Sequence, residues 1–171
     1  MAVTYIIHRP DFSSVRINNI EKEKAHECLK KYPAFKDLYT TFENNIEISA
    51  AVKDSTSFQK VHSPYTPDHI VYTGTEMLFI EDLERIEQNI EKYRERNECY
   101  PKVIAVKMTG VFTLGDKEDS SRITMLLFLD ALKIAVYTES FGDYRFMNKK
   151  QIDFIKNWEV EEFRSKVSLN K

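Results

Sequence analysis

The sequence has few glycines, and they are not clustered. Only four occur in 171 residues, at positions 74, 110, 115 and 142. Phosphate-binding loops and dinucleotide-binding turns need closely spaced glycines, because the backbone must approach the phosphate. The sequence therefore excludes both kinds of nucleotide site. Each remaining glycine is expected to mark a turn that requires a positive φ.

Long apolar runs, a strong net charge and paired cysteines are absent too. No stretch reaches the ~18 apolar residues of a membrane span, and the N-terminus lacks a secretory signal pattern. The net charge of -2, from 25 basic and 27 acidic residues, gives no long-range attraction to nucleic acid or an anionic membrane. Cys28 and Cys99 are predicted to be reduced thiols, with a single disulfide as the alternative. We therefore expect a cytoplasmic protein without nucleic-acid or membrane partners.

The hydrophobic fraction of 42% is typical of a soluble globular protein. Residues 50–65 show no hydrophobic period and predict a loop. This loop separates residues 1–63, expected to be either part of the same compact unit or a small lobe, from an aldolase-like α/β core at 64–171. Hydrophobic spacing and capping residues predict strands at 3–7, 70–73, 77–80, 102–106 and 111–114, and helices at 20–32, 35–46, 81–97, 119–140 and from Asn148 onward.

This order of elements predicts an α/β fold: a central sheet of about four to six short strands, with helices on its faces. The helix over 119–140 is apolar nearly all round in its middle, which places it in the core. The predicted core consists of Val103, Ile104, Val106, Phe112, Leu126, Leu129, Leu132 and Val136.

The tetrapeptide Thr66-Pro67-Asp68-His69 is the most motif-like segment for acid–base chemistry. Asp68 would orient His69 and raise its basicity. The favoured alternative is a turn that leads into a strand, with proline fixing φ. His62 could meet His69 across the intervening loop, but no carboxylate or cysteine lies at ligand spacing. We therefore predict no metal or cofactor, with zinc as the alternative.

The segment from Thr109 to Gly115 is bounded by glycines and is favoured to be a structural hairpin. The alternative is a small-molecule pocket lined by Thr109, Gly110 and Gly115 together with Thr66. Acidic residues at 116, 118 and 119 oppose an anion at the start of the following helix, because they would repel it.

Three motifs in order resemble the class II aldolase/adducin family. They are TPDHIVYTG, PKVIAVKMTGVFTLG with the long helix after it, and FIKNWEVEEFRSKVS, and together they cover residues 64–168. The resemblance is closest to the region that follows the catalytic lobe in long members, such as bifunctional rhamnulose-1-phosphate aldolase/dehydrogenase proteins. It implies a class II aldolase-like three-layer domain in a cytoplasmic, bacterial protein of carbohydrate metabolism.

The resemblance also implies which ligands to look for. The family's catalytic lobe holds zinc with three histidines, two from an H-x-H pair and one from an N-H-G turn, and uses a glutamate for acid–base work. This sequence has no H-x-H, and Met108-Thr109-Gly110 stands at the N-H-G position. Threonine is a poor zinc ligand. The resemblance therefore implies a lobe that is degenerate relative to the catalytic one.

Two hypotheses of function follow. The first is a non-catalytic or accessory domain in sugar-phosphate metabolism, which assembles with a catalytic aldolase lobe or with copies of itself, or binds a small ligand. The alternative is an active lyase on a ketose 1-phosphate with a rebuilt site, in which His69 and Asp68 are catalytic and His62 assists.

Overall fold

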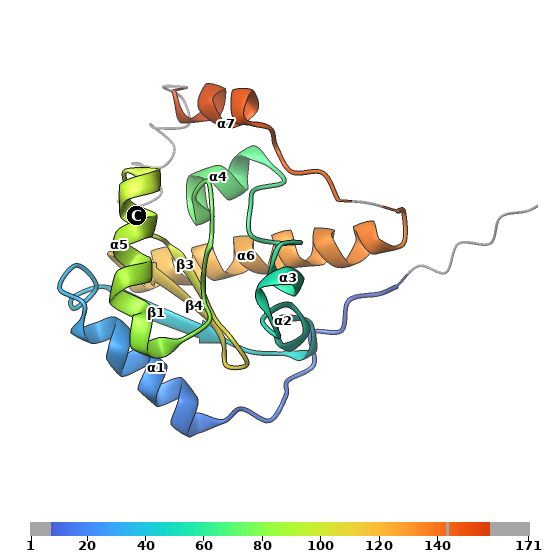
Figure 1. Ribbon diagram of the computed structural model, residues 1–171. Coiled ribbons are helices and arrows are strands. Elements are labelled where there is room, and N and C mark those ends of the chain that lie inside the picture. Colours follow the sequence, from blue (N-terminus) through green and yellow to red (C-terminus); the bar gives the residue numbers. More distant parts are fainter. Residues whose placement is uncertain (1–7, 143, 158–171) are drawn as a thin grey trace, which may run out of the picture.

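The computed structural model describes residues 8–142 and 144–157 (Figure 1). Four strands and eight helical segments follow one another along this part of the chain. In order they are α1 (Asn19–Lys31), β1 (Tyr39–Glu43), α2 (Ile46–Ala51), α3 (Ser55–Phe58), α4 (Pro67–Thr73), β2 (Leu78–Ile80), the 3-10 helix η1 (Leu83–Arg85), α5 (Ile86–Asn97), β3 (Val103–Val106), β4 (Gly110–Gly115), α6 (Glu118–Glu139) and α7 (Lys149–Lys156).

The four strands form one mixed sheet in the order β1-β4-β3-β2. β4 lies between β1 and β3 and is antiparallel to both, whereas β2 runs parallel to β3. A connection through η1 and α5 carries the chain from β2 to β3, as a parallel pair requires. The predicted short central sheet is thus confirmed, and β3 and β4 lie where the sequence predicted strands.

Helices cover both faces of the sheet. Ile104 and Phe112 point to one face and pack in a cluster with buried residues of α1 and α5. Val103, Ala105 and Val111 point to the other face and pack against Phe128 of α6. Alternate residues of a strand point to opposite faces, so β3 and β4 contribute to both clusters. The domain is therefore a three-layer α/β fold, as predicted.

Local signals account for several helix ends. Asn18 caps α1 by accepting hydrogen bonds from the backbone of residues 20 and 21. Asn148 and Gln151 form the predicted capping box at the start of α7. Figure 1 shows α7 lying over α4. The part of the predicted helix beyond residue 157 lies outside the described residues.

Two predicted elements are wrong in type. The helix predicted over 35–46 is instead a turn, the strand β1 and the beginning of α2, because β1 pairs along its whole length with β4. The strand predicted at 70–73 belongs to helix α4, which starts with Thr66 as N-cap and Pro67 in its first turn. This threonine–proline start is a strong helix signal, and it outweighs the β-propensity of the residues that follow.

The stretch 50–65, predicted as a loop, contains the end of α2 and the whole of α3. Val52, Phe58 and Val61 are buried in the cluster beneath α6. In addition, β1 joins the same sheet as β2, β3 and β4, so residues before position 64 pack with those after it. The predicted strand at 3–7 lies outside the described residues.

The predicted core is correct except along one side of α6. Leu126 is 63% exposed, and Leu129 is only partly buried. The outer side of α6 is not fully covered by the rest of the described chain, so the apolar run from 123 to 136 does not make it an interior helix. Buried residues on the side that faces the sheet are Met125, Phe128, Ala131, Leu132, Ala135 and Val136.

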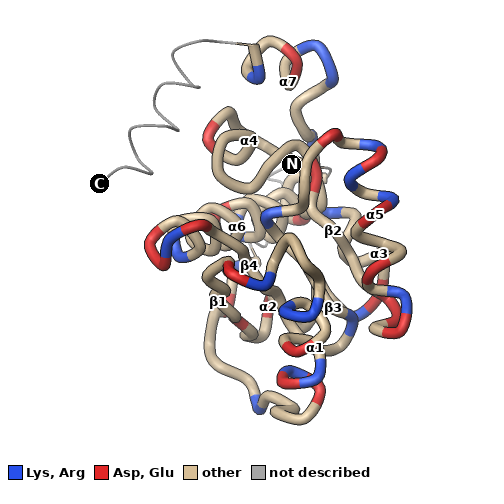
Figure 2. Tube along the Cα trace, turned by 90° about the vertical axis from the view of Figure 1, so that its left-hand side faces the viewer, with Lys and Arg blue, Asp and Glu red and all other residues tan. Residues whose placement is uncertain are grey.

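Charged residues of both signs alternate along α1 and α5 (Figure 2).

Cys28 and Cys99 are both free, and Cys99 is exposed. No helix among residues 8–142 and 144–157 has the length and apolar character needed to cross a membrane.

The two sides of α6 can be compared by mutation. We expect Phe128→Ala to lower the free energy of unfolding by about 3–5 kcal/mol, because it removes a fully buried ring and leaves a cavity. Leu126→Ala on the exposed side should change it by no more than about 0.5 kcal/mol. Urea unfolding of both variants measures the difference, and equal losses would contradict the described position of α6.

Candidate functional site

The predicted acid–base tetrapeptide opens helix α4. The hydroxyl of Thr66 accepts a hydrogen bond from the backbone N–H of His69 at 3.3 Å and so caps the helix. Asp68 lies in the first turn and is exposed. The side chain of His69 points inward and is fully buried. The capping geometry thus directs Asp68 and His69, although adjacent, to different surroundings.

Both ring nitrogens of His69 are engaged. Nδ1 accepts a hydrogen bond from the backbone N–H of Tyr65 at 3.2 Å. The proton of the neutral ring is therefore on Nε2, which donates to Oδ2 of Asp130 at 3.2 Å. Asp130 comes from α6, and its side chain is 54% exposed. The carboxylate hydrogen-bonded to the His69 ring is thus Asp130, whereas the sequence analysis assigned this role to Asp68.

Burial lowers the pKa of His69 below its usual value of 6.5. The hydrogen bond and charge of Asp130 act in the opposite direction, but the desolvation of the imidazolium is the larger effect. His69 is therefore held as a neutral ring that joins α4 to α6. The hydroxyl of Thr124 on α6 also contacts the same junction, with its single proton shared between the carbonyl of Ser120 at 2.9 Å and the carbonyl of Tyr72 at 3.2 Å.

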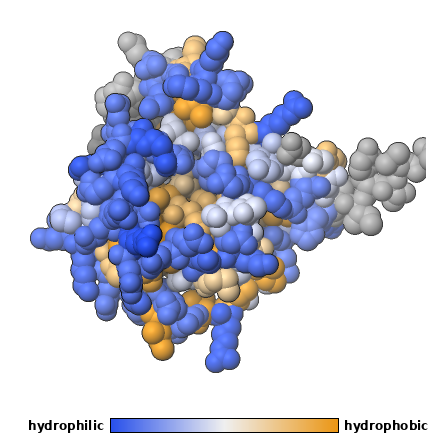
Figure 3. All heavy atoms as spheres, in the orientation of Figure 1, coloured by the Kyte–Doolittle hydropathy of each residue, from blue (hydrophilic) through white to orange (hydrophobic). Residues whose placement is uncertain are grey.

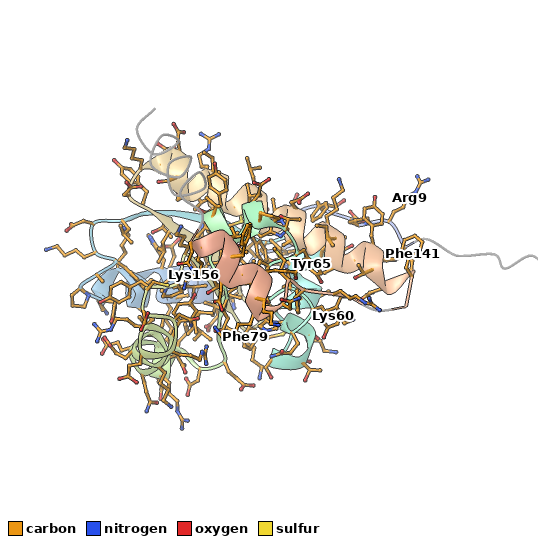
Figure 4. The ribbon with its side chains drawn as sticks, turned by 90° about the horizontal axis from the view of Figure 1, so that it is seen from above. Arg9, Lys60, Tyr65, Phe79, Phe141 and Lys156 are labelled. Carbon is orange, nitrogen blue, oxygen red and sulfur yellow. The ribbon has the colours of Figure 1, made fainter. Side chains whose placement is uncertain are left out.

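His62 lies close to this junction but uses its ring differently. Its Nδ1 hydrogen-bonds to the carbonyl of Gln59 at 2.9 Å. Its ring meets Phe146 edge-on, Phe146 packs on Tyr65, and Tyr65 approaches His69 edge-on. Figure 4 shows Tyr65 close to α7 when the molecule is seen from above. Contacts between His62 and His69 thus run through two aromatic rings.

The turn between β3 and β4 holds the other predicted site residues. Met108 has a φ of 58° and is 71% exposed. Thr109 is buried; its hydroxyl donates to the carbonyl of Lys107 at 3.2 Å, and its own carbonyl accepts from the Asn44 amide at 2.9 Å. The Thr109 side chain is therefore used within the turn itself.

Gly110 and Gly115 lie at opposite ends of β4. A Cβ at Gly110 would come within 2.7 Å of the Phe42 ring, and one at Gly115 within 2.4 Å of the Ser121 backbone nitrogen. Protein atoms therefore fill the space beside each glycine. The structure does not bring the two ends of the segment from Thr109 to Gly115 to one pocket.

The described residues do not offer a zinc site of the kind that the family resemblance implies. Residues 8–142 and 144–157 contain no group of three or more His, Cys, Asp or Glu side chains placed to hold a metal. At the turn that the resemblance assigns to the third histidine, the side chains of Met108 and Thr109 offer no nitrogen donor. The donor set present does not fit zinc.

Among the hollows lined by the described residues, one borders the predicted residue His62 and another lies away from the predicted site residues. One, of about 350 Å³, lies between α3 and α5, with Phe58, Met77 and Phe79 among its lining residues and His62 beside them. On this face Figure 3 shows apolar residues surrounded by hydrophilic ones. The other, of about 280 Å³, lies between α2, α3 and α6 and includes Glu47. Sequence patterns did not reveal either, because both are lined by residues from distant segments.

The fold is that of aldolase II superfamily proteins. An aldolase II superfamily protein from Pseudomonas syringae superposes with a TM-score of 0.56 at 14% identity, over 87% of this chain and 60% of that one. YgbL from Klebsiella pneumoniae, a candidate aldolase/epimerase/decarboxylase, gives 0.55 at 10% identity, over 79% and 64%. YgbL from Escherichia coli gives 0.54 at 10% identity, over 80% and 65%.

The chain spans 60–65% of the length of these structures. No protein-family model matches the sequence, and no curated protein matches it. At 10–14% identity the likeness establishes the fold and leaves the activity to be argued from the site.

The buried state of His69 predicts a dependence of stability on pH. Between the lowered pKa of the folded ring and 6.5, the unfolded chain binds more protons than the folded chain. The free energy of unfolding should therefore fall as the pH drops below 6.5, by at most about 1.4 kcal/mol per pH unit. Urea unfolding from about pH 8 to about pH 5 measures this slope.

His69→Gln removes the titrating ring and should flatten that slope. His62→Gln serves as the matched control, because it makes the same substitution at a histidine that is partly exposed. A wild type and a His69→Gln variant with the same pH dependence would show that the ring is not held neutral.

The close packing at Gly110 predicts a second effect. Gly110→Ala should lower the free energy of unfolding by more than about 1 kcal/mol, because the new methyl group would meet the Phe42 ring at 2.7 Å and the Glu43 carbonyl at 2.8 Å. Gly142→Ala is the control, since Gly142 also has a positive φ but has no neighbour within 4 Å. Thermal unfolding compares the two, and an equal shift would contradict the tight contact.

Proposed function

We propose that this chain is a non-catalytic, accessory domain with the aldolase II fold, and that it serves sugar-phosphate metabolism by assembly or small-ligand binding. One observation carries the proposal. At the β3–β4 turn, where the family resemblance implies a zinc-binding histidine, the exposed side chain is Met108, and the buried hydroxyl of Thr109 bonds to its own turn. The turn has kept a compact conformation with side chains that cannot bind zinc.

The surroundings of His69 support the same proposal. A general acid or base must reach the proton that it transfers in a substrate. The His69 ring is fully buried, and its two nitrogens bond to Tyr65 and Asp130. A substrate would first have to break the junction between α4 and α6. A structural role for His69 explains these contacts more simply than catalysis does.

Assembly is supported by the relation to proteins of the same fold. The chain spans 60–65% of the length of these aldolase II structures. We propose that a catalytic aldolase lobe, or a second copy of this domain, packs beside it. The exposed apolar side chain of Leu126 belongs to the surface available for such packing.

Metal and activity measurements test the proposal. Purified protein should contain no stoichiometric zinc after incubation with it, and should not cleave ketose 1-phosphates in a retro-aldol assay. Stoichiometric zinc together with cleavage would overturn the proposal. If that cleavage were also lost in His69→Ala, the alternative of a rebuilt lyase site with Asp68 and His62 would hold instead.

Binding and assembly have their own measurements. A sugar phosphate that binds the native state raises the melting temperature, so a panel of sugar phosphates tests ligand binding. Light scattering over a range of protein concentrations, alone and mixed with a class II aldolase, tests assembly. A chain that stays monomeric, ignores the aldolase and responds to no sugar phosphate would contradict an accessory role.

A further inference from the structure

The outer side of α6 carries a row of exposed charges with a leucine at its centre. We call it the α6 stripe; it consists of Asp119, Arg122, Leu126, Asp130 and Lys133, all of them exposed. Steps of three and four residues place them on one face of the helix, over about 21 Å of its length. The opposite face of α6 packs on the sheet through Phe128, so the stripe faces away from the sheet. In Figure 2, α6 lies on the opposite side of the molecule from α5.

The charges of the stripe are not paired with one another along the helix. Asp119 and Arg122 are three residues apart, as are Asp130 and Lys133, and this spacing allows ion pairs on a helix. Among residues 8–142 and 144–157, however, no ion pair includes Asp119, Arg122 or Lys133. Asp130 contacts His69, and its side chain is still 54% exposed. All four charges are therefore available to a partner molecule.

The order of these charges is complementary to itself. Asp119 and Lys133 lie seven residues before and after Leu126, and Arg122 and Asp130 lie four residues before and after it. If two α6 helices lie antiparallel and touch at Leu126, each residue faces the one equally far beyond Leu126 in the other copy. Asp119 then faces Lys133, and Arg122 faces Asp130. A parallel pair would bring like charges together, so the charge order selects an antiparallel pair with a two-fold axis.

The apolar side chains around Leu126 fit the same arrangement. Ile123 and Leu129 lie three residues before and after Leu126, on either side of the stripe, and both are partly exposed. In the antiparallel pair, Ile123 of each copy lies on the same side as Leu129 of the other. The contact would thus have an apolar centre and charged ends, as protein interfaces commonly do.

We propose that two copies of this domain associate through the α6 stripe, antiparallel about a two-fold axis at Leu126. The inference rests on the assembly role proposed above, and it specifies the partner, a second copy, and the surface. One helix face buries less area than a standard interface, so the dimer is weak and its population depends on protein concentration.

Sedimentation velocity of the whole chain over a range of protein concentrations tests the pairing. The wild type should change from monomer to dimer as the concentration rises. Lys133→Glu places like charges at two symmetric contacts of each dimer and should raise the dissociation constant at least about tenfold. Asp119→Lys should do the same with positive charges. Lys24→Glu on α1 is the matched control, since Lys24 is exposed away from the stripe, and it should associate like the wild type.

A mixture of the two stripe variants gives the sharper test. Neither variant should dimerise well alone, but a pair made of one Asp119→Lys chain and one Lys133→Glu chain has opposite charges at both contacts. An equimolar mixture should therefore dimerise about as strongly as the wild type. If Asp119→Lys unfolds, Lys133→Glu with its Lys24→Glu control still decides the first test.

The failure of this pairing can be told apart from the failure of the accessory role. A wild type that dimerises equally well with Lys133→Glu would show assembly through another surface, which overturns the stripe and keeps the accessory role. A wild type that stays monomeric but binds a class II aldolase would do the same. A mixture of the two folded variants that stays monomeric would also overturn the antiparallel arrangement.

Discussion

The domain depends on the pairing and burial of β4. This strand bonds to β1 along one edge and to β3 along the other, and five of its six residues are buried. Its side chains therefore have to fit two different layers, with Phe112 and Leu114 on the α1–α5 side and Val111 on the α6 side. Among the described strands, β3 is the other one that has a neighbour on each edge.

The same strand also fixes the start of α6. Gly115 leaves no room for a side chain, because the Ser121 backbone nitrogen would lie 2.4 Å from its Cβ. The buried hydroxyl of Thr113 donates a hydrogen bond to the carbonyl of Ser121 at 2.7 Å. The long helix is thus attached to the centre of the sheet at its first turn, and α4 then attaches to the helix through His69 and Asp130.

Elements with local signals could be predicted from the sequence, and elements that depend on distant partners could not. Asn18 and Asn148 cap helices with their own side chains, and β3 is a continuous apolar run buried on both faces. By contrast, β1 contains residues spaced three and four apart like those of a helix. It is a strand because it pairs with β4, about 70 residues further along the chain, and tertiary contacts override local propensity.

In the candidate site too, features with a local sequence signal could be predicted, and contacts with distant partners could not. The sequence pattern singles out His69, but its hydrogen-bond partner Asp130 lies 61 positions away, whereas the pattern suggests the adjacent Asp68. A signal was present, since Asp130 and Lys133 are the charged residues within the apolar run from 123 to 136. A carboxylate in such a run indicates a specific partner, although the sequence does not say which one.

Which residues of the β3–β4 turn can change depends on which contacts the fold requires there. The β3–β4 turn is held by backbone and near-backbone bonds: Thr109 N–H to the Val106 carbonyl at 3.0 Å, Met108 N–H to the Val52 carbonyl at 2.9 Å, and Asn44 to the Thr109 carbonyl. None of these bonds needs a histidine at the turn. The side chain of Met108 can therefore be changed without loss of the fold, whereas Gly110 cannot be enlarged without a clash. The scaffold thus constrains the glycine and leaves the exposed side chain of the turn free to vary.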